Sequence, residues 1–319
     1  MTAVSAPARA DGFFHELARE ARQRIDDAIA ARAPKLVPPV AIAVHYKAQK
    51  LGSIDLGAPL VALAAADLDG DGKAELFAVT PRDIVAYALR GRGPSELART
   101  TYSGELAAPA SRDPVGTAVV DGDALAVTVS GWARGVRVRW RGKSIVAELG
   151  DPGFVLCPGE RAQLAAGRNY FGSGAGAIYG AVCRDDLVDT AGHPLHARAS
   201  LSLGGRLDVA IERCDPGSPC QPLGAKHELP GVGVAFAVAD LDRDGVPDVI
   251  HSGAGAPGDA DAVKIFPLGG DPKKPTFRHS WSGGVAAIAV ADVDGDGALD
   301  VIVAVRLVGA TRVDLWRLN

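Results

Sequence analysis

The sequence predicts an all-β fold assembled from repeated units of short strands. Glycine (39) and proline (21) are frequent among the 319 residues and separate many short runs of Val, Ala, Leu and Ile, as expected for short strands joined by tight turns. One acidic motif occurs three times, each time between two such runs, at residues 67–75, 240–248 and 292–300, which we name loops 1, 2 and 3. With 47% hydrophobic residues, the chain can bury a substantial core.

The three loops share the pattern D-x-D-x-D-G-x-x-(D/E), which we number as positions 1 to 9. Calcium is a hard cation that takes six to eight oxygen ligands, and carboxylates at positions 1, 3 and 5 of a tight loop converge on one point. Position 7 supplies a backbone carbonyl, position 9 supplies another carboxylate, and the glycine at position 6 permits a sharp turn. The sequence therefore predicts three Ca²⁺ sites. The expected ligands are Asp67, Asp69, Asp71, Lys73 and Glu75 in loop 1, Asp240, Asp242, Asp244, Val246 and Asp248 in loop 2, and Asp292, Asp294, Asp296, Ala298 and Asp300 in loop 3.

Two other interpretations of the loops are weaker. An EF-hand needs a bidentate Glu at position 12 and a helix on each side, but position 12 is Ala78, His251 or Val303, and the flanks are short apolar runs typical of strands. An acidic surface turn that binds nothing would hold four carboxylates close together, and these repel one another strongly without a cation. We therefore expect calcium-binding loops that join strands.

The motif A-D-(L/V)-D-x-D-G-x-x-(D/E), followed by a hydrophobic strand, resembles the FG-GAP/VCBS repeat family, which includes the calcium-binding blades of integrin-α-like β-propellers. This resemblance implies a β-propeller of four-stranded blades, in which each loop links the innermost strand of a blade to the next strand. The motif covers three blades. The region from about residue 110 to 230 has to be interpreted from strand patterns alone.

The spacing of the loops favours five blades. Loops 2 and 3 start 52 residues apart, which is the length of one blade, and the chain ends on either side of the loops together make about one further period. We therefore expect N-terminal and C-terminal strands to complete the same blade and close the ring. Six blades are the alternative if residues 151–213 divide into two. The expected strands are 116–123, 124–130, 135–141 and 144–150 in blade 2, with Asp121 and Asp123 as remnants of an acidic loop, and 162–171, 177–183, 196–205 and 206–214 in blade 3.

Residues 12–33 predict an amphipathic α-helix ahead of the propeller. Its apolar side chains recur at helical spacing, and charged residues occupy the opposite face. These apolar residues are Phe14, Leu17, Ala21, Ile25, Ala28 and Ile29. We expect residues 1–34 to form a tail with this helix and residues 35–319 to form the propeller. The apolar face would pack against the propeller or dock a protein partner.

The cysteines indicate an oxidising compartment. All four lie between residues 157 and 220, and none belongs to a CxxC pair. Of the three connectivities, proximity favours Cys157–Cys183 with Cys214–Cys220. Residues 8–10, Ala-Arg-Ala, have the form of a signal-peptidase site, although the apolar segment that should precede it is missing, so the segment is either the remainder of an export signal or an ordinary disordered tail. No apolar run is long enough to span a bilayer. We expect an exported protein that is periplasmic, outer-membrane-associated or extracellular.

Motifs for catalysis are weak throughout the sequence. There is no G-x-S-x-G elbow, H-E-x-x-H helix or phosphate-binding glycine loop, and His193 and His196 lack a third zinc ligand. We therefore predict a non-catalytic, calcium-stabilised module that binds a protein partner or acts as a scaffold in an exported assembly. The alternative is a carbohydrate-binding or polysaccharide-degrading propeller, since such activities accompany FG-GAP/VCBS-like blades in some relatives.

One strand carries a stripe of basic residues. Arg137, Arg139 and Arg141 alternate with apolar residues, so they share one face, which is either an anion-binding stripe or the polar side of a half-exposed strand. Three bound Ca²⁺ ions would outweigh the formal net charge of −4 and leave a modestly basic surface. Such a surface favours an acidic protein or a polysaccharide as partner, and nothing indicates recognition of nucleic acid.

Overall fold

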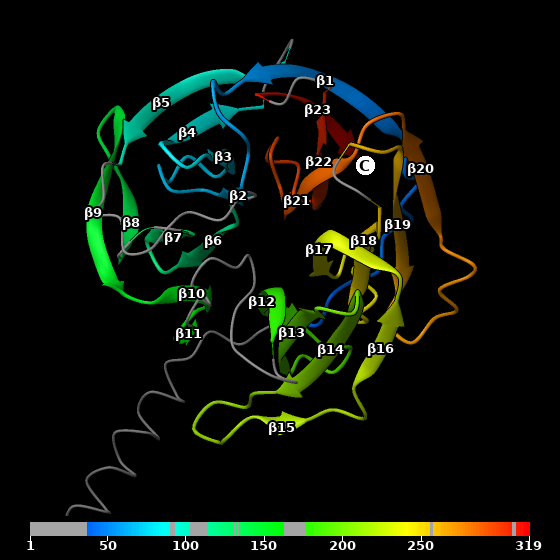
Figure 1. The fold of residues 1–319 in the computed structure, drawn as a ribbon. Helices are drawn as coiled ribbons and strands as arrows, with labels where there is room; N and C mark the ends of the chain where they lie inside the picture. The colour runs from blue at the N-terminus through cyan, green and yellow to red at the C-terminus, as the bar shows by residue number, and fades with distance from the viewer. Residues whose placement is uncertain are drawn as a thin grey trace, which may run out of the picture.

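The chain forms a five-bladed β-propeller (Figure 1). The structure is a computed structural model that describes residues 37–89, 93–102, 114–130, 132, 134–162, 177–255, 258–307 and 311–319. Within these ranges all regular structure is β-strand, which confirms the all-β prediction and the count of five blades. The helix expected at 12–33 lies outside the described residues. In the described ranges there is no helix long and apolar enough to cross a membrane.

Each blade is an antiparallel sheet, and in blades 1, 2 and 4 the strands follow one another in chain order from the centre outwards (Figure 1). Blade 1 contains β2 (Ala62–Ala66), β3 (Glu75–Val79), β4 (Asp83–Ala88) and β5 (Ser95–Thr101). Blade 2 contains β6 (Gly116–Asp121), β7 (Ala124–Val129), β8 (Arg134–Arg141) and β9 (Ser144–Pro152). Blade 3 contains β12 (Ile178–Val188), β13 (Pro194–Ser202), β14 (Arg206–Arg213), β15 (Gln221–Pro222) and β16 (His227–Pro230). Blade 4 contains β17 (Val232–Ala239), β18 (Asp248–Gly253), β19 (Asp261–Pro267) and β20 (Phe277–Trp281).

Blade 5 closes the ring by combining the two ends of the described chain. It contains β21 (Val285–Ala291), β22 (Asp300–Arg306), β23 (Arg312–Leu318) and, outermost, β1 (Ala48–Asp55). β1 runs antiparallel to β23 along the outside of the blade (Figure 1). Asp314 on β23 accepts hydrogen bonds from Lys50 Nζ and Ser53 Oγ on β1, each at 2.5 Å. The prediction that terminal strands complete one blade is therefore confirmed.

Apolar side chains between neighbouring blades form the core. Most sheets lie between two others, so strands such as β3 are buried on both faces and carry apolar residues at successive positions. Leu76 packs toward blade 5 and the next residue, Phe77, packs toward blade 2, and both are fully buried. Four such hydrophobic clusters join blades 5 and 1, 1 and 2, 3 and 4, and 4 and 5.

The interface between blades 2 and 3 is different, because among the described residues no hydrophobic cluster contains side chains from both blades. On β8, Val136 and Val138 pack toward blade 1, which leaves the arginines of this strand on the opposite face. Ion pairs within blade 2 engage all three: Arg137–Asp121 (2.6 Å), Arg139–Asp123 (3.2 Å), Arg139–Glu148 (3.0 Å) and Arg141–Glu148 (2.5 Å). The basic stripe is therefore a polar face whose charges are matched within the blade.

Blade 3 also turns a polar face toward this interface. On β13, Ala197 and Ala199 pack against blade 4, while His196 and Arg198 lie on the other face. The hairpin of β10 (Phe154–Cys157) and β11 (Glu160–Ala162) lies between the two blades (Figure 1). A short hairpin and polar contacts thus take the place that apolar packing occupies at the other interfaces.

Two disulfide bonds stabilise this part of the chain. Cys157 on β10 is bonded to Cys183 on β12, and Cys214 is bonded to Cys220 beyond the end of β14. This pairing confirms the connectivity that proximity favours. The first bond joins the β10–β11 hairpin covalently to blade 3.

Blade 3 differs from the expected strand order. Residues 177–183, 196–205 and 206–214 lie largely in β12, β13 and β14, but β12 is the innermost strand, and the outer edge is supplied by β15 and β16. The expected innermost strand at 162–171 lies outside the described residues except for Ala162 in β11. The apolar pattern of 162–171 suggested a strand, whereas the short, polar segments at the outer edge carry little strand signal.

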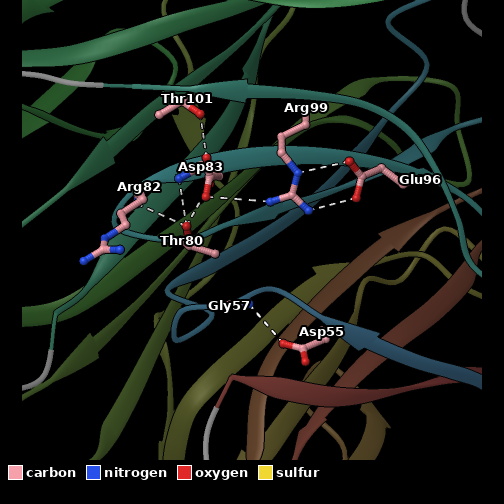
Figure 2. A network of polar contacts seen from close by, with 8 residues as sticks. All are labelled: Asp55, Gly57, Thr80, Arg82, Asp83, Glu96, Arg99 and Thr101. Carbon is pink, nitrogen blue, oxygen red and sulfur yellow. Dashed lines mark hydrogen bonds and ion pairs between the residues drawn. The ribbon is translucent and has the colours of Figure 1, made fainter.

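Polar contacts in blade 1 fasten its outer strand to its inner ones (Figure 2). In the β3–β4 turn, the buried Thr80 hydroxyl accepts the backbone N–H of Asp83 at 2.8 Å. Asp83 in turn accepts a hydrogen bond from Thr101 on β5 at 2.8 Å and faces Arg99 at 3.7 Å. Arg99 also donates two hydrogen bonds to Glu96 on the same strand, whereas the contacts of Thr101 and Arg99 with Asp83 tie β5 to the start of β4.

Candidate metal centres

Each acidic loop connects the innermost strand of a blade to the second strand. Loop 1 lies between β2 and β3, loop 2 between β17 and β18, and loop 3 between β21 and β22. This is the placement that the family resemblance implies. The apolar runs on either side of each loop pair in register as antiparallel strands, so the two ends of the loop are held close together. Because its two ends are fixed, each loop directs its carboxylate side chains into a small volume.

The carboxylate at position 1 shapes the turn by accepting backbone N–H groups. In loop 1, Asp67 accepts the N–H groups of Gly70, Asp71 and Gly72 at 2.8, 3.1 and 2.9 Å. The equivalent bonds in the other loops are Asp244 (3.1 Å) and Gly245 (3.0 Å) to Asp240, and Gly295 (2.6 Å) and Gly297 (2.7 Å) to Asp292. These bonds fold the backbone around the first carboxylate.

Positions 3 and 5 continue the same arrangement. Each carboxylate accepts the backbone N–H group two residues further along the chain, as in an Asx-turn. The position 3 bonds are Asp71 to Asp69 (3.0 Å), Asp244 to Asp242 (3.2 Å) and Asp296 to Asp294 (3.3 Å). The position 5 bonds are Lys73 to Asp71 (3.0 Å), Val246 to Asp244 (2.7 Å) and Ala298 to Asp296 (2.8 Å). The three loops therefore share one backbone design.

Two positions in each loop adopt a left-handed backbone. The position 6 glycines, Gly72, Gly245 and Gly297, have φ of 84°, 83° and 86°. Position 4 is also left-handed, with a glycine in loops 1 and 3, whereas loop 2 has Arg243 with a φ of 56°. Among the described residues Arg243 is the one non-glycine with positive φ. An L-residue adopts this region at a cost of roughly 1–2 kcal/mol, so the loop imposes this conformation on the arginine.

The position 9 carboxylates are buried beneath the loops. Glu75, Asp248 and Asp300 are 1%, 5% and 1% exposed. Each accepts the backbone N–H group of position 2, from Leu68 at 3.2 Å, Leu241 at 3.1 Å and Val293 at 3.3 Å. Burial raises the pKa of Glu75 and of Asp248 to about 7 and that of Asp300 to about 6, and the neighbouring loop carboxylates add to this effect.

The structure brings most of the predicted ligands together. Carboxylate oxygens lie within 4.8 Å of one another in three groups, namely Asp67, Asp69, Asp71 and Glu75, then Asp240, Asp242 and Asp244, then Asp292, Asp294 and Asp300. Asp248 and Asp296 belong to the same loops but lie outside these compact groups. The N–H groups of Lys73, Val246 and Ala298 bond to the position 5 carboxylates, and their carbonyls remain predicted ligands.

The loops of blades 5 and 1 contact each other directly. The N–H of Ala74 donates to the carbonyl of Asp292 at 3.0 Å, and a Cβ placed on Gly295 would lie 3.0 Å from Cε of Lys73. On the other side of loop 3, Arg243 of loop 2 approaches the position 6 glycine, whose added Cβ would lie 3.6 Å from Nη2. Basic side chains from the neighbouring loops therefore approach loop 3 from both sides.

Sequence reasoning missed two residues beside the loops. Arg317 on β23 donates hydrogen bonds to Asp294 at 2.6 Å and Asp300 at 2.5 Å. Tyr46 lies beside loop 2, where burial and the charges of Asp248 and Asp242 raise the pKa of its hydroxyl. Neither residue belongs to the motif. Tyr46 is far from loop 2 in sequence, and Arg317 follows loop 3 with the whole of β22 between them. No local pattern could have identified them.

The electrostatics of position 3 differ between loops 2 and 3. Burial and the neighbouring Asp244 raise the pKa of Asp242 above its ordinary value. Burial also raises the pKa of Asp294, but the hydrogen bond and positive charge of Arg317 outweigh it and leave that pKa below its ordinary value. The same motif position is thus short of positive charge in one loop and supplied with it in the other.

Other candidate groups are engaged within the fold. His193 contacts Asp189 through Nδ1 at 2.9 Å, and His196 contacts Asp185, so the two histidines bind separate carboxylates and do not converge. A central cavity of about 550 Å³ lies between the five innermost strands. Its walls are largely small and apolar, with Ala64, Ala118, Val182, Ala237 and Ala289 each contributed by a different blade.

Comparisons with known proteins find weak structural likenesses alone. No family model matches the sequence, and no curated protein matches it. One similar solved structure is the core factor of S. cerevisiae, with 8% identity and a TM-score of 0.41; the match covers 88% of this chain and 62% of that chain. Another is the PQQ-bound form of aldose sugar dehydrogenase from Streptomyces coelicolor, with 10% identity and a TM-score of 0.40; the match covers 88% of this chain and 99% of that chain. The chain thus spans less than two thirds of the core factor chain. At these scores neither likeness bears on activity, and the resemblance to FG-GAP/VCBS repeats remains a prediction from the motif.

Proposed function

We propose that this protein is a calcium-stabilised, non-catalytic β-propeller that acts as a protein-binding or scaffold module in an exported assembly. The observation that carries the calcium part is the convergence of carboxylate oxygens within 4.8 Å in all three acidic loops. The donor set consists of oxygen alone, which suits a hard cation such as Ca²⁺ better than a metal that prefers nitrogen or sulfur. Four carboxylates in one loop also provide the charge that a divalent cation requires.

Calcium would stabilise the blades through the buried ligands. Without a cation, the pKa values of Glu75 and Asp248 are raised to about 7, so burying their charged forms is unfavourable at neutral pH. A cation bound in the loop offsets both this burial and the repulsion between carboxylates. Because each loop ties the first strand of a blade to the second, the metal would stabilise the blade itself.

The scaffold role is supported by what surrounds the loops. Their carboxylates already accept backbone hydrogen bonds, and a bound ion would use oxygens that remain, which leaves little room for a substrate. The basic stripe on β8 is engaged in ion pairs, and the rings of His193 and His196 contact Asp189 and Asp185. Two disulfides agree with an exported location. A partner would then bind elsewhere, with the segment 12–33 as the proposed docking element.

The calcium part is tested by melting the protein in excess Ca²⁺ and in EGTA at neutral pH. A ligand that binds only the folded state raises the melting temperature, so we expect a higher value with Ca²⁺ and no comparable increase with Mg²⁺, which demands a more regular octahedral site. A Ca²⁺ melt that coincides with the EGTA melt would refute the proposal.

The scaffold part is tested by affinity capture from the native envelope fraction with the full chain and with a variant lacking residues 1–34. Loss of a captured protein on truncation supports docking through this segment. Retention by a polysaccharide column, unchanged by truncation, would instead indicate a carbohydrate-binding propeller. The two results are distinct, because the acidic loops are intact in both forms of the protein.

A further inference from the structure

Arg317, near the end of β23, reaches into loop 3. Its Nη2 donates to Oδ2 of Asp294 at 2.6 Å, and its Nε donates to Oδ1 of Asp300 at 2.5 Å. The arginine side chain is 14% exposed and that of Asp300 is 1% exposed. A guanidinium does not lose its proton in a protein. Loop 3 therefore contains a permanent positive charge that is hydrogen-bonded to two of its four carboxylates.

Loop 2 has the same motif without this arginine. Among the described residues, no basic side chain forms an ion pair with the loop 2 carboxylates, whereas two ion pairs reach loop 3. The strand register explains the difference. Arg317 on the third strand of blade 5 pairs with Ile302, which lies two residues after position 9 of loop 3. The residue that pairs with the same position on the third strand is Ile265 in blade 4 and Ala86 in blade 1. Neither of these side chains can supply a charge.

We propose that Arg317 serves as the built-in cation of loop 3, so that this loop keeps its shape without calcium and binds Ca²⁺ at least about tenfold more weakly than loop 2. The inference rests on the proposed calcium function. A Ca²⁺ ion entering loop 3 must displace the guanidinium from oxygens of Asp294 and Asp300 or share them with a like charge. Both routes weaken binding relative to a loop whose carboxylates have no basic partner.

The position of loop 3 gives the replacement of calcium by Arg317 a structural role. Loop 3 belongs to blade 5, where the terminal strands close the ring, and Arg317 lies on β23, the strand that pairs with β1. The hydrogen bonds of Arg317 therefore join β23 to the loop that precedes β22. Blade 5 would hold its closing strand in place even when loop 3 contains no calcium.

The inference is tested by isothermal titration of the calcium-free full chain with Ca²⁺, using matched position 3 variants. Asp242→Asn is expected to remove one tight site from the wild-type count, and Asp294→Asn is expected to leave the count of tight sites unchanged. If Asp294→Asn removes a tight site as Asp242→Asn does, the inference is overturned while the proposed calcium function stands. If the wild type shows no tight site at all, the calcium function itself fails.

Changing the arginine provides the complementary test. Arg317→Gln is expected to add one tight site and to lower the melting temperature in EGTA, with Ca²⁺ restoring it. Arg317→Lys keeps the charge and is expected to retain the wild-type count. The matched control is Arg312→Gln on the same strand, which is exposed and remote from the loop 3 contacts. An unchanged count of tight sites in a folded Arg317→Gln protein would contradict the inference.

Discussion

Arg198 on β13 donates two hydrogen bonds to the carboxylate of Glu160 on β11, at 2.9 and 2.7 Å. These hydrogen bonds and the positive charge of Arg198 lower the pKa of Glu160 below its ordinary value. The pair links blade 3 to the β10–β11 hairpin, and the Cys157–Cys183 disulfide makes a second link between the same elements. The β10–β11 hairpin, which lies between blades 2 and 3, is therefore fastened to blade 3 by a charge pair and a covalent bond, and it buries Val155 and Leu156 of β10.

The first prediction concerns the two disulfides. Replacing Cys157 and Cys183 by Ser together is expected to reduce the free energy of unfolding by about 2–4 kcal/mol. Replacing Cys214 and Cys220 by Ser is expected to cost less. The reason is that the first bond closes a loop with a sequence separation of 26 and the second a separation of 6, and a longer loop loses more entropy when it is closed. Denaturant titration under non-reducing conditions measures both values.

Hydrogen exchange locates the effect of the first disulfide. In the Cys157→Ser, Cys183→Ser variant, faster exchange is expected first in β10 and in the adjacent β12, and the amides of blades 4 and 5 should be slow as before. Uniform acceleration in all five blades would show that the bond stabilises the ring as a whole and not this interface.

The second prediction concerns pH in calcium-free buffer. The folded-state pKa of Asp248 and of Glu75 is raised to about 7, well above the usual value of an unfolded carboxyl. Between the unfolded and folded values, the folded state binds more protons, so the free energy of unfolding falls as pH rises. The melting temperature is therefore expected to fall from about pH 5 to about pH 8, and saturating Ca²⁺ should remove this decline because it binds the charged carboxylates.

Asp248→Asn provides the control for the pH prediction. An amide is neutral at every pH in this range, so the calcium-free melting temperature of this variant should depend less on pH than that of the wild type. A wild-type melting temperature that rises steadily toward pH 8 in calcium-free buffer would contradict the raised pKa values.

Much of the fold could be predicted from local sequence features, and the structure shows why. The three acidic loops fix where the innermost and second strands of blades 1, 4 and 5 begin and end, and their spacing gives the blade length. The strands of blade 2 are predicted by alternating polar and apolar residues, for example in residues 135–141, which form most of β8. Blade 3 was harder, because its outer edge consists of β15 and β16, which are short and contain proline at their ends.

The surroundings of the candidate sites could not be predicted, because they depend on contacts between distant segments. Arg317 reaches loop 3 only because β23 folds back beside β22. Tyr46 reaches loop 2 because the segment before β1 passes it, where the N–H of Ile42 donates to the carbonyl of Asp242 at 2.7 Å. The ligand types and their spacing are local, whereas the charge balance around them is a property of the fold.

The third prediction compares two glycines at position 6. Gly72→Ala is expected to cost roughly 1 kcal/mol, because φ is 84° and an added Cβ would meet no atom within 4 Å. Gly245→Ala is expected to cost clearly more, since its φ is 83° and the new Cβ would lie 2.8 Å from the backbone nitrogen of Thr190. Denaturant titration in saturating Ca²⁺ gives both values, and equal costs would show that the contact with Thr190 relaxes freely.

The fourth prediction concerns ring closure at Asp314. This residue is 8% exposed and accepts hydrogen bonds from Lys50 and Ser53 on the paired strand β1. Asp314→Ala removes the acceptor of both hydrogen bonds at the β1–β23 junction, although the half-exposed Lys50 can be hydrated instead, so the free energy of unfolding is expected to fall by about 1–2 kcal/mol. Denaturant titration in saturating Ca²⁺ measures the loss, and faster hydrogen exchange should appear in β1 before the other strands.

The pH dependence of the free energy of unfolding separates the effect of the charge on Asp314 from the effect of the size of its side chain. Burial raises the pKa of Asp314, but the hydrogen bonds from Lys50 and Ser53 outweigh it and leave the pKa below its ordinary value. Its stabilising contribution is therefore present above the unfolded pKa and is lost as pH falls through the folded pKa. Asp314→Asn should remove this acid-sensitive part. The control is Asp259→Asn, because Asp259 is an exposed carboxylate between β18 and β19, away from the β1–β23 junction. A loss of equal size in both variants would show that Lys50 and Ser53 do not depend on Asp314 to hold β1 in place.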